Sequence, residues 1–206
     1  MGLPHDSAVA LSSGTSSLFL ALKILNAKEK KVTFPGYVCS ALRHAVAMAG
    51  GVEKTVDITT NSPNIDMNSI SSSDISIIPH MYGLPIQIDN VDNLVIEDCC
   101  QALGAKVNDM MVGLQGDVGI FSFYATKLMT SGGQGGMFIS KNKEYVDAVR
   151  DYREFDYRND TKNRFNFKMT DLQAAIGREQ LKKLPNFLKR REEIFQYYKK
   201  AGLDLF

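Results

Sequence analysis

Two kinds of segment alternate along this chain, as the order of its hydrophobic and polar positions shows. Short apolar runs rich in β-branched residues predict strands, and the stretches between them have the wider apolar spacing that is typical of helices. We expect strands at residues 31–34, 53–58, 75–79, 94–97, 119–123 and 136–140, and helices at 16–25, 40–49 and 144–153. This alternation predicts an α/β fold, a three-layer α/β/α arrangement with a mostly parallel central sheet and helices on both faces.

The last quarter of the chain departs from this alternation. Residues 153–168 are polar and charged with interspersed Phe and Tyr, and this pattern alone indicates a solvated surface loop. From residue 170 onward apolar residues recur at helical spacing. Because Pro185 interrupts that stretch, we expect one helix before it and a second helix over 186–200.

Composition narrows the classes of partner. The chain has 206 residues, of which 44% are hydrophobic and 23% are charged, and its formal net charge is +1. That balance argues against a general electrostatic attraction to nucleic acid or to an anionic membrane. Three cysteines do not make a disulfide framework, and no His/Cys cluster has the spacing of zinc ligands. We therefore expect a cytoplasmic protein that acts on small molecules, with no metal, nucleic-acid or membrane partner.

Polar residues that follow predicted strands or open predicted helices are the candidates for chemistry. Ser13-Gly14-Thr15 precedes a helix, where free N–H groups and hydroxyls suit a phosphate, although such residues are also common helix caps. Asp98 follows the strand at 94–97, where it could meet a ligand or cap a helix. Lys127 follows the strand at 119–123 and could pair with phosphate or condense with a carbonyl cofactor, although solvated loop lysines are commoner.

Other readings of the same segments remain weaker. Residues 132–136 are rich in glycine but lack both GxGxxG and the Walker pattern, so nucleotide binding by either route is not supported. Cys99 and Cys100 have no identifiable His base, which disfavours a thiol hydrolase. His80 could touch a ligand, although a structural histidine is the more frequent case. An anion site, an acid, a lysine and a glycine loop together are what pyridoxal phosphate requires.

Seven motifs in order resemble the DegT/StrS family of pyridoxal-phosphate-dependent sugar aminotransferases, within the fold-type-I superfamily. They are Ser13-Gly14-Thr15, Pro35-Gly36-Tyr37, His80-Met81-Tyr82-Gly83, Glu97-Asp98-Cys99-Cys100-Gln101-Ala102, Ser122-Phe123-Tyr124-Ala125-Thr126-Lys127, residues 132–136 and residues 166–175. The resemblance implies that 1–184 form the cofactor-binding large domain of fold type I. Residues 185–206 would be a helix that leads toward a small C-terminal domain, which we expect this chain to lack.

The resemblance also implies cofactor contacts. Lys127 would bind pyridoxal phosphate covalently and then move the α-proton, and Asp98 would pair with the pyridinium nitrogen. Gln101 would lie near the cofactor ring or its hydroxyl. The phosphate would be held by three residues, Gly14, Thr15 and Ser122.

Further implied residues lie at the edges of the site. Family members carry an aromatic ring two residues after the position of Tyr37; here Cys39 stands there, so stacking is weaker or comes from elsewhere, such as Tyr37. Asn166 or Lys168 would reach the phosphate of the neighbouring subunit, which implies a homodimer with a shared active site. The expected substrate contacts are His80 and Tyr82.

The implied reaction moves an amino group from an amino acid such as glutamate to a keto group of a nucleotide-linked sugar. The presence of Lys127 argues against the dehydratase branch of the family, where that position is not Lys. One alternative stays open. The chain could be a truncated, catalytically inactive cofactor-binding homologue, or a subunit that needs a partner polypeptide.

Overall fold

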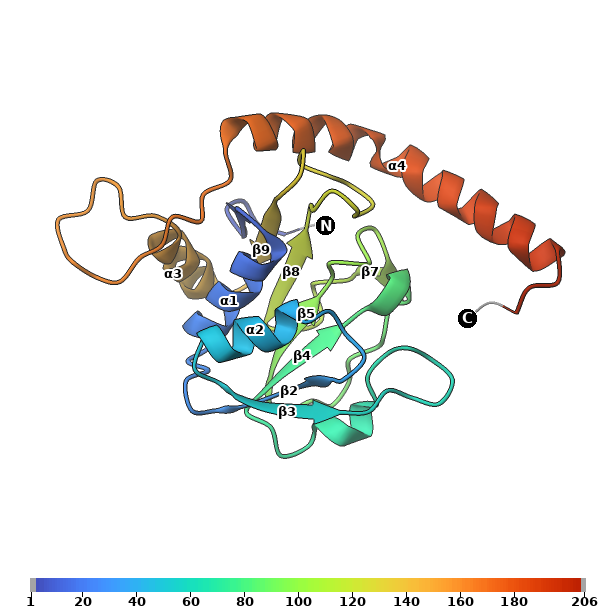
Figure 1. Cartoon of the computed structure of the whole chain (residues 1–206), viewed down its shortest axis with the longest axis horizontal. Helices are drawn as coiled ribbons and strands as arrows, with labels where there is room; N and C mark the ends of the chain where they lie inside the picture. The colour runs from blue at the N-terminus through green and yellow to red at the C-terminus, as the bar shows by residue number, and fades with distance from the viewer. Residues whose placement is uncertain (1–2, 205–206) are drawn as a thin grey trace.

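The computed structural model describes residues 3–204, which build a mostly parallel seven-stranded sheet flanked by helices (Figure 1). The strands are β1 (Ala8–Leu11), β2 (Lys31–Pro35), β3 (Val52–Val56), β4 (Ile75–Pro79), β5 (Leu94–Asp98), β8 (Val118–Ser122) and β9 (Gly136–Ile139). Their order is β1-β9-β8-β5-β4-β2-β3, and all neighbours from β8 to β3 pair in parallel. The predicted α/β fold class is confirmed.

One edge of the sheet is antiparallel and contains a strand that the sequence pattern does not predict. β9 pairs antiparallel with β8, and β1 pairs antiparallel with β9. β1 is only four residues long, so its own pattern is too short to identify it. Its pairing places Leu11 opposite Gly136, and this brings the start of the first helix against β9.

Three helices cover one face of the sheet: α1 (Gly14–Ile24), α2 (Ala41–Met48) and α3 (Lys143–Arg153) (Figure 1). α1 lies in the middle of this layer, and its residues 16–22 are all buried. A capping box between Ser13 and Ser16 fixes where α1 begins. The start of α1 is therefore a rigid point of the structure.

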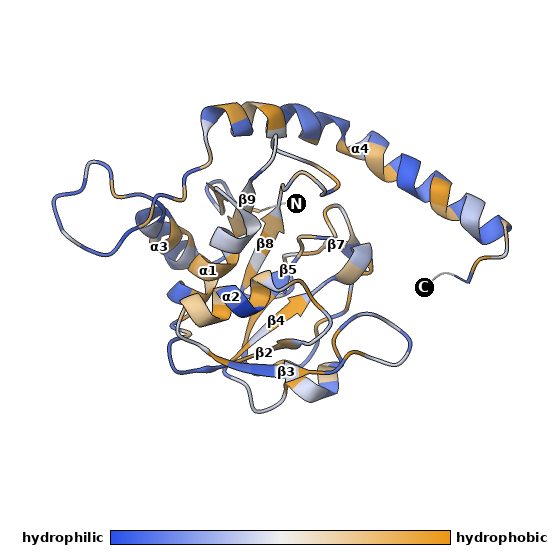
Figure 2. Cartoon of the chain, viewed as in Figure 1, coloured by the Kyte–Doolittle hydropathy of each residue, from blue (hydrophilic) through white to orange (hydrophobic). Residues whose placement is uncertain are grey.

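Alternation along the strands divides the core between the two faces of the sheet. Ile120 and Phe138 pack on the helical face, whereas Phe121 and Ile139 pack on the other. On that second face the covering residues come mainly from loops and from short elements. These elements are the helical turns η1 (Met67–Ile70) and η2 (Met81–Gly83) and the hairpin of β6 (Lys106–Val107) and β7 (Met110–Met111). Figure 2 shows β4 and β8 in hydrophobic colours and the edge strand β3 in hydrophilic ones.

The C-terminal helix differs from the prediction. α4 (Asp171–Lys200) is one continuous helix with Pro185 inside it, so the expected division into two helices is wrong. A proline removes one backbone hydrogen bond and crowds the preceding turn, which bends a helix more readily than it ends one when both flanks favour helix. Figure 1 shows α4 changing direction as it crosses above the sheet. No helix within residues 3–204 is both long and apolar enough to cross a membrane.

Replacement of Gly136 by alanine tests the contact between β9 and the start of α1. A Cβ atom there would lie 2.2 Å from the Ser13 carbonyl oxygen and 2.7 Å from the Gly14 nitrogen, both of them backbone atoms that cannot turn away. We expect Gly136→Ala to lower the free energy of unfolding by about 2–3 kcal/mol, measured by urea denaturation. Gly36→Ala is the matched control, because its Cβ would meet nothing closer than the Val56 carbonyl at 3.9 Å. Equal stability of the two variants would contradict this account.

Candidate functional site

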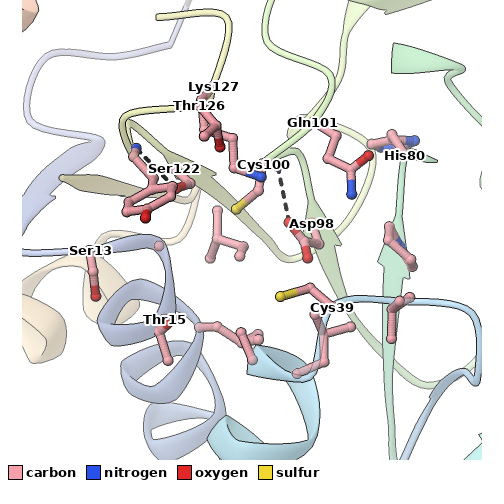
Figure 3. A pocket seen from close by; sticks show the side chains of 18 of the residues that line it. Ser13, Thr15, Cys39, His80, Asp98, Cys100, Gln101, Ser122, Thr126 and Lys127 are labelled. Atoms are coloured by element: carbon pink, nitrogen blue, oxygen red, sulfur yellow. Dashed lines mark hydrogen bonds between the residues drawn. The ribbon is translucent and has the colours of Figure 1, made fainter. Parts of the chain in front are cut away.

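A pocket of about 390 Å³ opens at the carboxyl ends of β4, β5 and β8, beside the start of α1 (Figure 3). It brings together most of the residues that the sequence singles out: Gly14, Thr15, His80, Asp98, Gln101, Ser122 and Lys127. Its lining also includes Thr126 and Gln134, which the sequence analysis does not single out. Their signal is one of position, since Thr126 precedes Lys127 and Gln134 lies within the glycine-rich segment.

One end of the pocket has the groups that an anion site requires. The Ser13 hydroxyl caps α1 by accepting the Ser16 N–H at 3.0 Å, and within residues 3–204 no acceptor is found for the N–H groups of Gly14 and Thr15. A Cβ added to Gly14 would lie 2.8 Å from the Ser122 Cβ, so only glycine keeps this space open. Unused N–H groups at a helix N-terminus, with two hydroxyls beside them, form a cradle for a phosphate.

An acid and a lysine face the same pocket from neighbouring strands. Asp98 is the last residue of β5 and is 8% exposed, and its Oδ1 accepts the Cys100 N–H at 3.0 Å. Lys127 lies in the turn after β8, where its N–H donates to the Tyr124 carbonyl at 3.0 Å. Figure 3 shows both side chains in the pocket. A carboxylate and an amine that line one pocket can both contact a single bound ligand.

The thiols near this site are poor nucleophiles. Burial raises the pKa of Cys99 and of Cys100 well above the usual range, and the negative charge of Asp98 adds to the effect on both. Both thiols therefore stay protonated at neutral pH, and the thiolate is the reactive form. Cys39 lines the pocket from the turn after β2, at the position where an aromatic ring was expected.

His80 has no ring nitrogen free for a substrate. The imidazole is fully buried, its Nε2 lies 3.0 Å from Glu97 Oε2, and its Nδ1 accepts the Ile86 N–H at 3.2 Å. Because Nδ1 accepts, Nε2 carries the proton and donates to Glu97. The substrate contact expected of His80 stays a prediction, and it would not use a free ring nitrogen. In this structure His80 lines the pocket and supports the turn after β4.

Glu97 accepts hydrogen bonds from separate segments and holds them together. Its carboxylate accepts three backbone N–H groups of the 113–116 loop at 2.6–2.8 Å, besides the His80 proton. Burial alone would raise the pKa of Glu97, but these hydrogen bonds outweigh it and lower the pKa. The ligand atoms of Glu97, His80 and Cys99 lie within 4.8 Å of one another, a spacing that could hold a metal ion. Since the carboxylate and imidazole already satisfy each other, we interpret the cluster as structural.

Two tyrosines stand at the rim of the pocket. Tyr82 has φ 55° and ψ 18°, a left-handed conformation that is strained for a bulky residue, and its N–H donates to Gln101 Oε1 at 2.9 Å. Its hydroxyl lies 2.8 Å from that of Tyr37. The Tyr37 ring packs on Tyr82 with ring centroids 6.4 Å apart and does not line the pocket. The contact of Tyr37 with a cofactor therefore stays a prediction, and in this structure the Tyr37 ring is engaged with Tyr82 at the surface.

The charge-rich segment before α4 is anchored more firmly than a solvated loop. Phe165 and Phe167 stack with centroids 4.9 Å apart, and both pack edge-on against Phe19 of α1. The residues between and after them face outward, so Asn166 is exposed and Lys168 pairs with carboxylates of its own loop. Neither Asn166 nor Lys168 lines the pocket of its own chain.

Comparison with known proteins agrees with this geometry. The model of the DegT/DnrJ/EryC1/StrS aminotransferase family matches residues 2–204. A UDP-4-amino-4,6-dideoxy-N-acetyl-beta-L-altrosamine transaminase from Campylobacter jejuni subsp. jejuni serotype O:2 is 32% identical over 226 residues. The alignment covers 97% of this chain and 58% of that relative, so the chain spans little more than half of its length.

Solved structures share the fold. A DegT DnrJ EryC1 StrS aminotransferase from Brucella abortus superposes with a TM-score of 0.89 at 24% identity, over 97% of this chain and 60% of that one. The PLP form of Spr1654 from Streptococcus pneumoniae superposes with a TM-score of 0.85 at 21% identity, over 94% of this chain and 59% of that one. These likenesses confirm the fold-type-I architecture.

Replacement of Glu97 by glutamine tests whether this acceptor holds the 113–116 loop and His80 in place. The amide would set a donor against N–H donors, and we expect a loss of about 3 kcal/mol in the free energy of unfolding at pH 7. The lowered pKa of Glu97 means that its stabilisation is complete above its ordinary pKa of about 4.5 and is lost as the pH falls through the lower folded value.

The difference between wild type and Glu97→Gln should accordingly narrow below about pH 4.5, measured by urea denaturation across a pH series. Glu179→Gln is the control, because Glu179 is exposed on α4 and its pair with Lys182 lies in solvent. A gap that stays constant at all pH values would show that the charge of Glu97 contributes nothing.

Proposed function

Because the chain belongs to the DegT/DnrJ/EryC1/StrS aminotransferase family, we propose that it binds pyridoxal phosphate and transfers an amino group to a nucleotide-linked sugar. The amino donor is an amino acid such as glutamate, and the acceptor is a keto group on the sugar. The observation that carries this proposal is the meeting of Asp98, Lys127 and the start of α1 in one pocket. The name of the Campylobacter jejuni relative supports a nucleotide-linked sugar as acceptor.

The residues present fit this cofactor. Its phosphate requires an anion cradle, and Gly14 occupies a position where a side chain would fill that space, because its Cβ would lie 2.8 Å from the Ser122 Cβ. Its pyridine nitrogen requires a carboxylate, and its aldehyde requires a lysine; Asp98 and Lys127 line the same pocket. The volume of about 390 Å³ lies in the range of small-molecule sites.

Pyridoxal phosphate supplies an electron sink that stabilises negative charge at the substrate carbon. The protein has to keep that sink charged, and Asp98, buried and hydrogen-bonded to the Cys100 N–H, favours a proton on the ring nitrogen by its own negative charge. Lys127 provides the amine that holds the cofactor and then carries a proton to and from the reacting carbon.

The remaining contacts orient the cofactor. Gly14, Thr15 and Ser122 bind the phosphate with N–H and O–H groups. Gln101 Oε1 accepts the Tyr82 N–H and its Nε2 lies 3.8 Å from the Met81 sulfur, so the second N–H of this amide would be the donor available to a cofactor. Tyr82 contacts the substrate at the rim, and His80 supports the turn after β4.

We also propose a homodimer in which each subunit completes the other's site. Asn166 is exposed and Lys168 lies on the outer side of the same anchored segment, away from the pocket of their own chain. From there they reach the phosphate bound by the neighbouring subunit. The three free cysteines, of which Cys39 is exposed, suit a reducing cytoplasm, and we propose that location.

Loss of Lys127 tests the covalent link. After incubation with pyridoxal phosphate and reduction with borohydride, we expect the cofactor mass on the peptide that contains residue 127 in the wild type and none in Lys127→Ala. The far-ultraviolet circular dichroism of the variant should be unchanged. Lys189→Ala, an exposed position on α4, is the control and should retain the label. Label that persists in Lys127→Ala would refute the assignment.

Glutamate distinguishes transfer from mere binding. Addition of glutamate to the loaded wild type should remove the visible band of bound cofactor, because glutamate would give its amino group to the cofactor and leave as the keto acid. A band that ignores glutamate would favour the alternative, a cofactor-binding homologue or a subunit that needs a partner. An absent band would refute cofactor binding by this chain.

Substitution of Asn166 tests the shared site. We expect Asn166→Ala to weaken cofactor binding several-fold although the residue lies outside its own pocket, and sedimentation should show dimers. A mixture of Lys127→Ala and Asn166→Ala chains should regain sites of wild-type affinity, since one heterodimer site has both residues intact. A monomer that binds the cofactor tightly would rule out the shared site.

A further inference from the structure

The paired tyrosines at the pocket rim carry an inference that rests on the proposed function and deepens it. We propose that Tyr37 and Tyr82 form a sugar rim, which binds the neutral, hydroxyl-bearing sugar of the nucleotide-linked acceptor. The rim would select the sugar, while the nucleotide and its phosphates are bound elsewhere.

The two tyrosines come from turns after different strands, and each is adjacent in sequence to a residue that lines the pocket. Tyr37 belongs to the turn after β2 and is followed by Val38, which lines the pocket. Tyr82 belongs to the turn after β4 and is preceded by Met81, which also lines the pocket. The hydroxyl–hydroxyl contact of 2.8 Å joins these turns at the pocket edge. The bridge therefore lies next to residues of the pocket lining, where it could contact a substrate that enters the pocket.

The chemistry of the bridge matches a sugar hydroxyl. One phenol donates its proton to the other, which leaves one proton and several lone pairs directed outward. Among residues 3–204 neither hydroxyl has another hydrogen-bond partner. Tyr37 is 52% exposed and Tyr82 is 59% exposed, so ring surface is also free to cover the apolar C–H face of a sugar.

The rim is held rigid before any ligand arrives. Tyr82 keeps its left-handed conformation because Gln101 accepts its N–H at 2.9 Å. Asn64 holds the same turn at both ends: its Oδ1 accepts the Met81 N–H at 2.9 Å, and its Nδ2 donates to the Leu84 carbonyl at 3.0 Å. Asn64 itself is 5% exposed. A strained residue that its surroundings hold in place is typical of sites that are organised in advance for a ligand.

The charges around the rim favour a neutral partner. Residues 36–39 and 81–84, the two turns that carry the tyrosines, contain no charged side chain. The hydrogen bond from Tyr37 raises the pKa of Tyr82, so that phenol stays protonated at neutral pH. Without a cation the rim has little to offer a diphosphate, whereas uncharged hydroxyls are its natural ligands.

The experiment compares a sugar nucleotide with its nucleotide alone. UDP-N-acetylglucosamine and UDP are titrated calorimetrically into the full chain loaded with pyridoxal phosphate. The proteins are the wild type, the double variant Tyr37→Phe with Tyr82→Phe, and the control Tyr197→Phe, a tyrosine exposed on α4. Phenylalanine keeps both rings and removes only the hydroxyls, so the fold is preserved.

We expect the double variant to bind UDP-N-acetylglucosamine about 3- to 10-fold more weakly, with UDP affinity unchanged and the control equal to wild type. Equal weakening for both probes, no weakening for either, or a wild type that binds neither probe would each overturn the proposal. The visible absorbance of bound cofactor in the same samples tests the proposed function separately. An absent band would count against cofactor binding, whereas the affinities for the two probes test the sugar rim.

Discussion

A buried negative charge organises the working end of this domain. Glu97 lies at the centre of the sheet, fully buried, and is stabilised there by N–H groups from the 113–116 loop and by His80. A buried carboxylate without such donors would lower the stability of the fold. The 113–116 loop and the turn after β4 are therefore held next to Glu97. The wall of the pocket is thereby fixed from behind by a residue that does not line it.

Asp98, the next residue in the sequence, points to the opposite face of the sheet from Glu97. Strand alternation sends Glu97 to the face covered by loops and Asp98 to the pocket beside α1. Glu97 is saturated with hydrogen bonds and supports the structure, whereas Asp98 lines the pocket and accepts the Cys100 N–H. The pair shows how one strand end can serve architecture and chemistry at adjacent positions.

Residue pattern was sufficient where position along an element decides the outcome. Asp98, Lys127 and Gly14 could be predicted because strand ends and a helix start converge in any parallel α/β sheet. The hydrogen bonds of His80 to Glu97 and Ile86 could not be predicted, because only the folded chain brings these groups together. For the same reason the engagement of Tyr37 with Tyr82 was invisible. The continuity of α4 through Pro185 depended on flanking turns rather than on the proline alone.

The close approach of Gly136 to Ser13 also bears on the order in which parts of the chain fold. The backbone at the start of α1 is in contact with β9, which is the last strand of the sheet in the sequence. Because α1 packs mainly on the strands β8 and β9, which come late in the sequence, a chain emerging from the ribosome has no finished cradle until β9 is available. A ligand of that cradle therefore cannot assist the first steps of folding. It can only stabilise a chain whose sheet is already complete.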